Sequence, residues 1–203
     1  MENEKYLSDL EEIRSIMRKS TQFISLSGLS GIIIGVYALV GATIAFVVIN
    51  QHNRSYITLE SLTFKKLILI ALCVLIASII TGVVFTVKKA KKNNLSVSSK
   101  PAIQLMLNFA IPLITGGIFS ILLLRHGYYG LIGATTLIFY GLACINASKY
   151  TFRDIRQLGI IQIVLGLISV EFPGNSLYFW AIGFGVCHII YGALMYYKYD
   201  YKQ

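Results

Sequence analysis

The chain has 203 residues, of which 56% are hydrophobic and only 13% charged, and its formal net charge is +9. A soluble domain is usually about one quarter charged and about half apolar, and the mean hydropathy here is +0.69. These values exclude a disordered chain, a nucleic-acid-binding domain and an ordinary soluble enzyme. They predict an all-α polytopic protein that has the lipid bilayer as its partner and binds no nucleic acid.

Residues 1–20 precede the first apolar run and carry both charge signs. Ser8 and Glu11 have the spacing of a capping box, which marks the start of a helix. Three apolar residues then fall on one face of that helix, at Leu10, Ile13 and Met17. We predict a short amphipathic helix at the cytoplasmic membrane surface. A docking site for a cytoplasmic protein is the alternative interpretation.

Six apolar runs follow, and none has a charged residue in its interior. They cover residues 21–50, 65–87, 101–124, 128–148, 155–172 and 177–197. A bilayer core about 30 Å thick needs about 20 helical residues, and lipid offers no partner for free backbone groups. Residues 21–203 are therefore predicted to form a six-helix transmembrane bundle, in which the fifth run is the shortest.

The lysines and arginines predict the orientation of these spans. If the N-terminus is cytoplasmic, only Arg54, Lys65, Lys66 and Arg125 lie outside, and every inner segment has at least two basic residues. The positive-inside rule therefore predicts that both termini are cytoplasmic. The most basic segment follows the second span, and four of its side chains are assigned to lipid headgroups: Lys88, Lys89, Lys91 and Lys92.

Small residues recur in the first span at Ser27, Gly31 and Gly35. The spacing of four places them on one helix face, where they allow a neighbouring helix to approach closely. We predict that these three residues form a helix-packing surface.

Polar residues inside the apolar runs are the main functional candidates, because a polar atom in lipid needs a partner. At 1.5 Å per residue, Asn108, Gln162 and His188 lie within about 5 Å of the same depth. Four further residues complete the predicted polar cluster: Gln104, Thr115, Tyr140 and Tyr37. One interpretation is that these groups hydrogen-bond one another and fix helix register. The alternative is a hydrophilic pocket or proton-linked site around His188.

Two arrangements would imply other chemistry. Residues 28–31 read GLSG, and His188 lies in the last run, which resembles the serine and histidine of rhomboid-type intramembrane proteases. The resemblance implies a Ser30–His188 pair, although the serine here is on the first span rather than the fourth. A two-histidine, carboxylate metal site would need residues from three outer loops: His52, His126, Glu60 and Glu171. Their spacing does not require such a site, so no metal, cofactor or catalytic residue is predicted.

Two stretches, FISLSGLSGI at 23–32 and GFGVCHIIYGALMYYKY at 183–199, resemble a family of uncharacterised six-span bacterial inner-membrane proteins. The resemblance implies a bacterial inner-membrane setting and no known activity. The function expected first is therefore non-enzymatic: structural, regulatory, or binding a membrane or cytoplasmic protein partner. A small-solute or proton-coupled transporter with a polar site around His188 is the alternative, and an intramembrane hydrolase comes third. The oligomeric state stays open.

Overall fold

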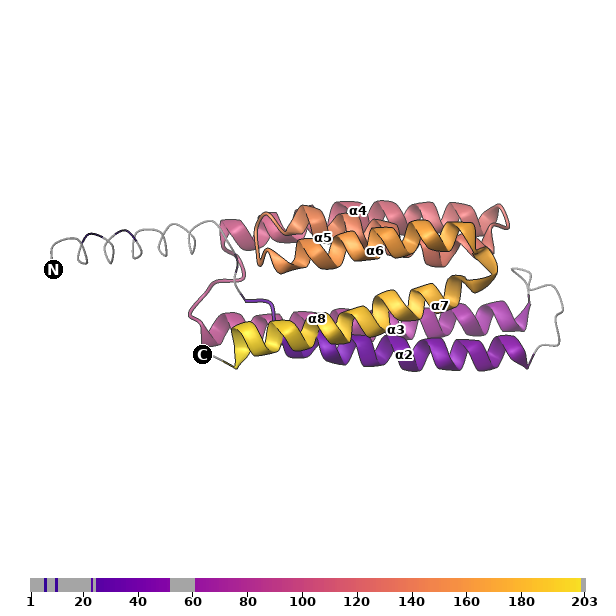
Figure 1. Ribbon diagram of the computed structural model, residues 1–203, viewed down its shortest axis with the longest axis horizontal. Helices are drawn as coiled ribbons and strands as arrows, with labels where there is room; N and C mark the ends of the chain where they lie inside the picture. The colour runs from indigo at the N-terminus through magenta and orange to yellow at the C-terminus, as the bar shows by residue number, and fades with distance from the viewer. Residues whose placement is uncertain (1–5, 7–9, 11–22, 24, 52–60, 202–203) are drawn as a thin grey trace.

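The computed structural model describes residues 6, 10, 23, 25–51 and 61–201. Long helices run side by side and form an elongated bundle (Figure 1). The first five are α2 (Gly28–Asn50), α3 (Leu62–Lys92), α4 (Lys100–Arg125), α5 (Ile132–Ala147) and α6 (Asp154–Glu171). The predicted amphipathic helix at 1–20 lies outside the described residues, apart from Tyr6 and Leu10.

The last rod of the bundle is continuous but changes its helical type three times. It consists of α7 (Ser176–Trp180), the π-helical η3 (Ala181–Cys187), α8 (His188–Met195) and the π-helical η4 (Tyr196–Asp200). In a π-helix each N–H bonds one residue further back than in an α-helix, and such turns are frequent at functional sites. The apolar run at 177–197 predicts a single span, and no pattern in it indicates the two π-helical segments.

Five helices in the described part of the chain are long and apolar enough to cross a membrane. They are α2, α3, α4, the helix from Tyr129 to Ala147, and the helix from Pro173 to Asp200. The chain is therefore a multi-pass helical membrane protein. α6 is the exception, because its 18 residues include Asp154, Arg156 and Glu171. It corresponds to the fifth predicted run, which was the shortest of the six.

The first span starts later than the sequence predicts. α2 begins at Gly28 rather than at residue 21, and Ser27 before it has an extended backbone, with φ −97° and ψ 128°. The backbone of Phe23, upstream of the helix, pairs elsewhere: its N–H donates to the Tyr150 carbonyl at 2.7 Å, and Thr151 Oγ1 donates to its carbonyl at 2.8 Å. The residues before α2 therefore join it to the α5–α6 connection.

The helices form two units of three. In the first unit, α3 and the last rod both pack against α2, and in the second unit α4 and α6 both pack against α5. The last rod crosses between the units, because α7 and η3 also contact α5 and α6 (Figure 1). The centre of each unit is thus one helix, and α3 and α4 lie at the periphery.

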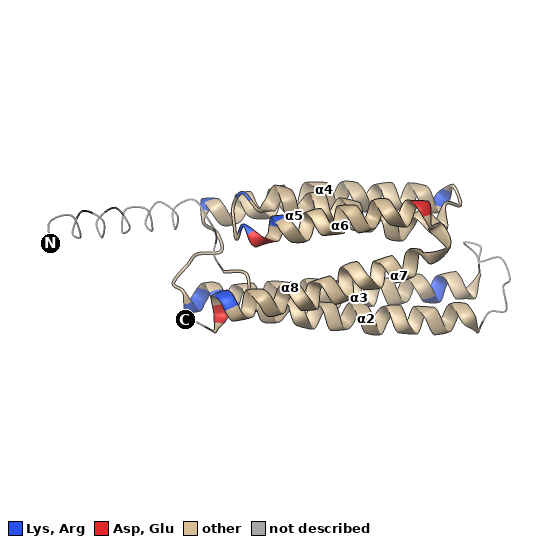
Figure 2. Cartoon of the chain, viewed as in Figure 1, with Lys and Arg blue, Asp and Glu red and all other residues tan. Residues whose placement is uncertain are grey.

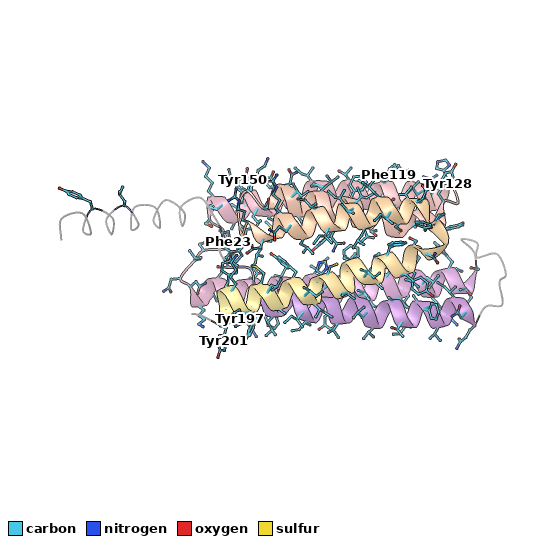
Figure 3. All side chains as sticks on the ribbon, in the orientation of Figure 1. Phe23, Phe119, Tyr128, Tyr150, Tyr197 and Tyr201 are labelled. Atoms are coloured by element: carbon cyan, nitrogen blue, oxygen red, sulfur yellow. The ribbon has the colours of Figure 1, made fainter. Side chains whose placement is uncertain are left out.

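Small residues fill the interior, and large apolar residues cover the surface. The buried apolar side chains include six alanines of α2 and α5: Ala38, Ala42, Ala45, Ala134, Ala143 and Ala147. Leucine, isoleucine and valine side chains project outward along the rods (Figure 3), and many of the exposed ones lie on α3 and α4. This inverted pattern fits a lipid environment, where helices associate by close packing rather than by burying apolar surface.

One end of the bundle is closed by Phe23. Its side chain is 4% exposed and packs with Ala90 of α3 and Ala102 of α4. Figure 3 shows it between the two units at the end where the C-terminus lies. Because α3 and α4 belong to different units, Phe23 contributes to holding the units together at this end.

Candidate functional site

His188 begins α8, directly after the π-helical η3, and only 4% of it is exposed. Its Nδ1 lies 2.9 Å from the Gly183 carbonyl and its Nε2 lies 2.7 Å from the Tyr140 hydroxyl. A carbonyl oxygen can only accept, so Nδ1 carries the hydrogen and Nε2 accepts from the Tyr140 O–H. The geometry therefore describes a neutral imidazole with both nitrogens hydrogen-bonded.

Gln162 of α6 is fully buried beside this histidine. Its Nε2 donates to the Gly183 carbonyl at 2.8 Å, so that one oxygen accepts from both α6 and the His188 ring. Nε2 is also 3.5 Å from Nδ1 of His188, but both atoms are donors in this arrangement and do not bond each other. Tyr140, Gln162, Gly183 and His188 are called the His188 cluster below.

Gly183 has no side chain because there is no room for one. A Cβ there would lie 2.5 Å from Gln162 Oε1 and 2.4 Å from the side chain of Leu137. The glycine lets α5 and α6 approach the last rod closely enough for the Gln162 amide to reach the backbone. Sequence reasoning missed Gly183, although a glycine-rich IGFGVC stretch directly before a histidine was an available signal.

Aromatic rings surround the Tyr140–His188 contact. The Tyr140 ring centroid is 5.0 Å from that of Phe184 and 5.8 Å, edge-on, from that of Phe109 in α4. Trp180 continues this packing toward the far end of the last rod, with its ring 5.1 Å from Phe184. The cluster thus lies where the two units meet, in an environment that favours strong hydrogen bonds.

The structure brings Tyr140, Gln162 and His188 together, but it places the α4 residues elsewhere. Asn108 Nδ2 donates to the Gln104 carbonyl at 2.9 Å, within its own helix. Thr115 is exposed and donates to the Ile111 carbonyl. Counting residues gave the depth of Asn108 but not its direction around the helix axis. Phe109, the next residue, is the one that faces Tyr140.

Tyr37 and Ser30, both on α2, have no described hydrogen bond to the His188 ring. Tyr37 is half-buried. Ser30 Oγ donates to the Ser27 carbonyl at 2.7 Å, one turn back. Because both nitrogens of His188 have other partners, the Ser30–His188 pair implied by the protease resemblance does not form in this structure.

Glycines of α2 lie directly against the last rod. A Cβ at Gly31 would lie 3.1 Å from the Cα of Gly192, and one at Gly35 would lie 2.7 Å from the Gly185 carbonyl. Ser27 precedes the helix and makes no side-chain cap. Gly28 takes its place in the helix contact, with a virtual Cβ only 2.2 Å from the backbone nitrogen of Tyr196. The packing series therefore runs Gly28, Gly31, Gly35 rather than from Ser27.

Lys89 differs from the other lysines at the end of α3. Lys88, Lys91 and Lys92 are exposed, as contact with headgroups requires. Lys89 turns inward: its Nζ forms an ion pair with Asp200 and donates to the Leu26 carbonyl at 2.9 Å. The Asp200 carboxylate also accepts from the Gly28 N–H at 2.9 Å, at the N-terminus of α2, where a negative charge is favoured.

A second ion pair at this end involves Asp154, the first residue of α6. Lys198 Nζ and the Tyr199 hydroxyl both donate to its Oδ2, at 2.9 Å and 2.8 Å. Burial alone would raise the pKa of the Asp154 carboxyl, but these hydrogen bonds and the charge of Lys198 outweigh it and hold the pKa below 3.8. Sequence reasoning missed both pairs, because they join segments far apart in the chain.

The outer-loop metal hypothesis is only partly covered by the structure. His52 and Glu60 lie outside the described residues. Among the residues that are described, no three histidine, cysteine, aspartate or glutamate side chains lie close enough together to hold a metal ion.

Comparison with protein-family models, curated proteins and solved structures finds no match to this chain. The resemblance noted at 23–32 and 183–199 therefore stays a prediction, and no family is identified.

Proposed function

We propose that the chain is a six-span protein of a bacterial inner membrane with both termini in the cytoplasm. Figure 2 shows that the charged residues of the described part of the chain lie toward the two ends of the bundle. The end that holds the C-terminus carries most of the described basic residues: Lys88, Lys89, Lys91, Lys92, Lys100, Lys149, Arg153, Arg156 and Lys198. The opposite end carries Lys65, Lys66 and Arg125. The positive-inside rule favours the richer end as cytoplasmic.

α6 is the sixth span in this proposal. Its charged residues lie at its ends, and residues 157–170 between them are uncharged. A helix of 18 residues is about 27 Å long, close to the hydrocarbon thickness. Close packing against α5 supports it, since a Cβ at Gly159 would lie 2.6 Å from the Gly141 carbonyl. α5 thus shields part of α6 from lipid.

Its function is proposed to be non-enzymatic: a structural, regulatory or partner-binding role carried out through helix contacts. The observation that carries this proposal is the hydrogen bonding of the His188 cluster. His188 Nε2 joins the last rod to α5, the Gln162 amide joins α6 to it, and Nδ1 bonds the Gly183 carbonyl within the rod itself. Ser30 likewise bonds within its own turn. The polar groups thus serve helix packing, and no nucleophile–base pair forms among them.

A partner would bind at the peripheral helices, α3 and α4. The apolar residues Ile76 and Ile79 of α3 and Ile114 and Ile118 of α4 are all more than half exposed. The test is site-specific photo-crosslinking at these four positions in growing cells. The proposal expects an adduct with one protein of defined mass on at least one of the two helices. Adducts with lipid alone at all four positions would contradict partner binding.

A proton-coupled transporter of small solutes is the second candidate. Two buried polar atoms beside the His188 cluster, Gln162 Oε1 and the Tyr191 hydroxyl oxygen, have no hydrogen-bond partner among the described residues. Buried polar atoms without partners are rare and often mark a water or ligand site. The assay is solute-driven proton uptake into proteoliposomes, with His188→Gln expected to abolish it and the exposed His126→Gln as control. No uptake above protein-free liposomes would remove this candidate.

A further inference from the structure

The end of the last rod, the π-helical η4, is bonded to helices of both three-helix units. Lys198 Nζ and the Tyr199 hydroxyl donate to the carboxylate of Asp154, which begins α6 in the second unit. Asp200, one residue later, forms an ion pair with Lys89 of α3 in the first unit. Residues two positions apart project to nearly opposite sides of a helix with about four residues per turn. Lys198 and Asp200 can therefore bind different units at the same time.

The attachment of η4 to the first unit is the firmer of the two. The Lys89 and Asp200 side chains are 12% and 13% exposed. Lys89 Nζ also donates to the Leu26 carbonyl at 2.9 Å, and the Asp200 carboxylate accepts from the Gly28 N–H at 2.9 Å. Separation of this pair would leave two largely buried charges without partners, which is costly. We therefore expect η4 to stay bound to α2 and α3.

The attachment of η4 to the second unit is weaker. The Lys198 side chain is 57% exposed and that of Asp154 is 27% exposed, and an ion pair with an exposed member is screened by solvent. The Tyr199 ring packs on Phe152, with centroids 4.1 Å apart, and Lys89 Nζ lies 5.6 Å from the centroid of the same Phe152 ring. The contacts that would break first are thus those of Asp154 and Phe152 with η4.

At the opposite end the units are joined through the chain itself. The last rod follows α6 through the short turn η2 (Pro173–Asn175), and its first helix, α7, packs against α5 and α6. A Cβ at Gly130 would lie 2.9 Å from the Pro173 side chain, so this end is closely packed. Figure 1 shows the rod leaving the second unit there and lying along α2 toward the C-terminus. A separation of the units that pivots at η2 would therefore be largest at the basic end.

The segment before α2 is also fixed to both units at the basic end. The Phe23 carbonyl accepts from Thr151 Oγ1 of the α5–α6 connection, and the Leu26 carbonyl accepts from Lys89 of α3. Between them, Ser25 is fully buried, and its Oγ has no hydrogen-bond partner among the described residues. The segment therefore tethers the units and limits how far they separate. Water that enters on opening would give Ser25 Oγ the partner that a buried hydroxyl needs.

We propose that η4 is a releasable clasp, which closes the basic end between the two units and opens by leaving Asp154 while it stays bound to Lys89. Opening needs no covalent change, because only hydrogen bonds, an ion pair and a ring contact are exchanged for contacts with water. In the open arrangement the Lys198 ammonium and the Asp154 carboxylate are hydrated separately. The clasp is a conformational device, and it does not depend on which of the two candidate functions the chain has.

Distances between pairs of spin labels, measured by double electron–electron resonance, test the clasp. The full-length protein, with its native cysteines changed to alanine, is placed in nanodiscs of zwitterionic lipid, and labels are attached to cysteines at exposed positions. Lys88→Cys with Arg153→Cys reports the two units at the basic end, and Lys66→Cys with His126→Cys reports them at the opposite end. Lys88→Cys with Tyr201→Cys reports whether the end of the rod stays with the first unit.

The variants that break the releasable contact are Lys198→Gln and Asp154→Ala. The matched control is Lys149→Gln, an exposed lysine of the α5–α6 connection. We expect both clasp variants to add a population with a longer distance between positions 88 and 153, and high salt to do the same in the parent chain, because salt screens an exposed ion pair. The control, and the distances between positions 66 and 126 and between positions 88 and 201, should not change.

Three results would overturn the proposal. The first is an unchanged distance between positions 88 and 153 in both clasp variants, because the contact with Asp154 would then not hold the units together. The second is equal lengthening at both ends of the bundle, which would indicate general loosening. The third is a longer distance between positions 88 and 201 with the distance between positions 88 and 153 unchanged, because η4 would then leave the first unit instead of the second.

Discussion

His188 illustrates how single residues adapt to a lipid environment. An imidazole in the hydrocarbon region is costly unless its nitrogens are bonded, and here a tyrosine and a backbone carbonyl supply the two partners. A leucine side chain at this position would need neither hydrogen-bond partner. The histidine therefore makes the junction between the units specific: Nδ1 is satisfied within the last rod, and Nε2 is satisfied only when α5 places Tyr140 against it.

Phenylalanine at either of two tyrosines near His188 is predicted to change the free energy of unfolding differently. Tyr140→Phe leaves the buried Nε2 without a donor and should lower the free energy of unfolding by about 1–2 kcal/mol. Tyr191→Phe removes a buried hydroxyl that has no partner among the described residues, and it should leave the stability unchanged or raise it slightly. Thermal unfolding of both variants in the same detergent measures the difference. Equal losses would contradict the hydrogen-bond assignment.

The two ion pairs at the basic end should differ in strength. The Lys89 and Asp200 side chains are only 12% and 13% exposed, whereas Lys198 is 57% exposed. Asp200→Asn leaves Lys89 without its carboxylate, and removal of one partner of a largely buried pair costs about 3 kcal/mol. Lys198→Gln should have little effect, because exposed pairs are screened by solvent. A larger loss of thermal stability for Lys198→Gln would contradict this ranking.

Acid should weaken the contact at Asp154. The pKa of its carboxyl is held below 3.8 in the folded protein, so the group binds a proton less readily folded than unfolded. Its contribution to stability is therefore complete above pH 3.8 and is lost as the pH falls through the folded pKa. Unfolding midpoints of the protein and of Asp154→Asn, compared from about pH 6 to about pH 3, should converge in acid. A difference that widens in acid would contradict the sign.

At the scale of helices, glycine decides how closely neighbours approach. Gly192 of α8 faces α2, and a Cβ there would lie 2.6 Å from the Ile32 nitrogen and 2.7 Å from the Gly28 carbonyl. These are backbone atoms, which can move only if the helices separate. Gly117 of α4 has nothing within 4 Å of its virtual Cβ. The same residue type therefore has a packing role in one helix and none in the other.

Alanine at these two glycines should act in opposite directions. Gly192→Ala should push α2 and α8 apart and lower the unfolding temperature. Gly117→Ala should be neutral or stabilise by up to about 1 kcal/mol, because alanine is the better helix former. Thermal unfolding in detergent compares the two. Destabilisation by Gly117→Ala without any effect of Gly192→Ala would contradict the packing described for α2 and the last rod.

Helix positions could be predicted from the sequence because apolar runs of span length have few other solutions in lipid. The predicted and observed ends of α4, at 101–124 and Lys100–Arg125, differ by one residue. Other features depend on distant contacts. The late start of α2 accompanies hydrogen bonds of the Phe23 backbone to the Tyr150 carbonyl and the Thr151 hydroxyl, and no local sequence pattern indicates them. The π-helical segments of the last rod are likewise features that no local sequence pattern indicates.

The candidate site could be predicted in part. Polarity within an apolar run identified Tyr140, Gln162 and His188, which the structure brings together. It did not separate them from Asn108 and Thr115, because depth along a helix is readable from residue number and direction around the axis is not. The ion pair between Asp200 and Lys89 was also not predicted, because the two residues are 111 positions apart and no local pattern relates them.

At the scale of the whole molecule, the helices pack more extensively within each of the two units than between them. Close glycine contacts join helices within each unit, as between Gly141 of α5 and Gly159 of α6. Between the units, the described contacts include the His188 cluster in the middle, Phe23 with the Asp154 pair at the basic end, and α7 against α5 and α6 at the opposite end. Relative movement of the units would therefore require these contacts to change first.

The threading of the whole chain is tested most directly by single cysteines placed at Asn94, Arg153 and Gly174, all exposed, in a background with Cys73, Cys144 and Cys187 changed to alanine. An impermeant thiol reagent is applied to intact cells and to inverted membrane vesicles. Six spans with cytoplasmic termini predict that Asn94→Cys and Arg153→Cys react only in the vesicles, and that Gly174→Cys reacts only in intact cells. Labelling of positions 153 and 174 from the same side would show that α6 does not cross the membrane and would contradict the account.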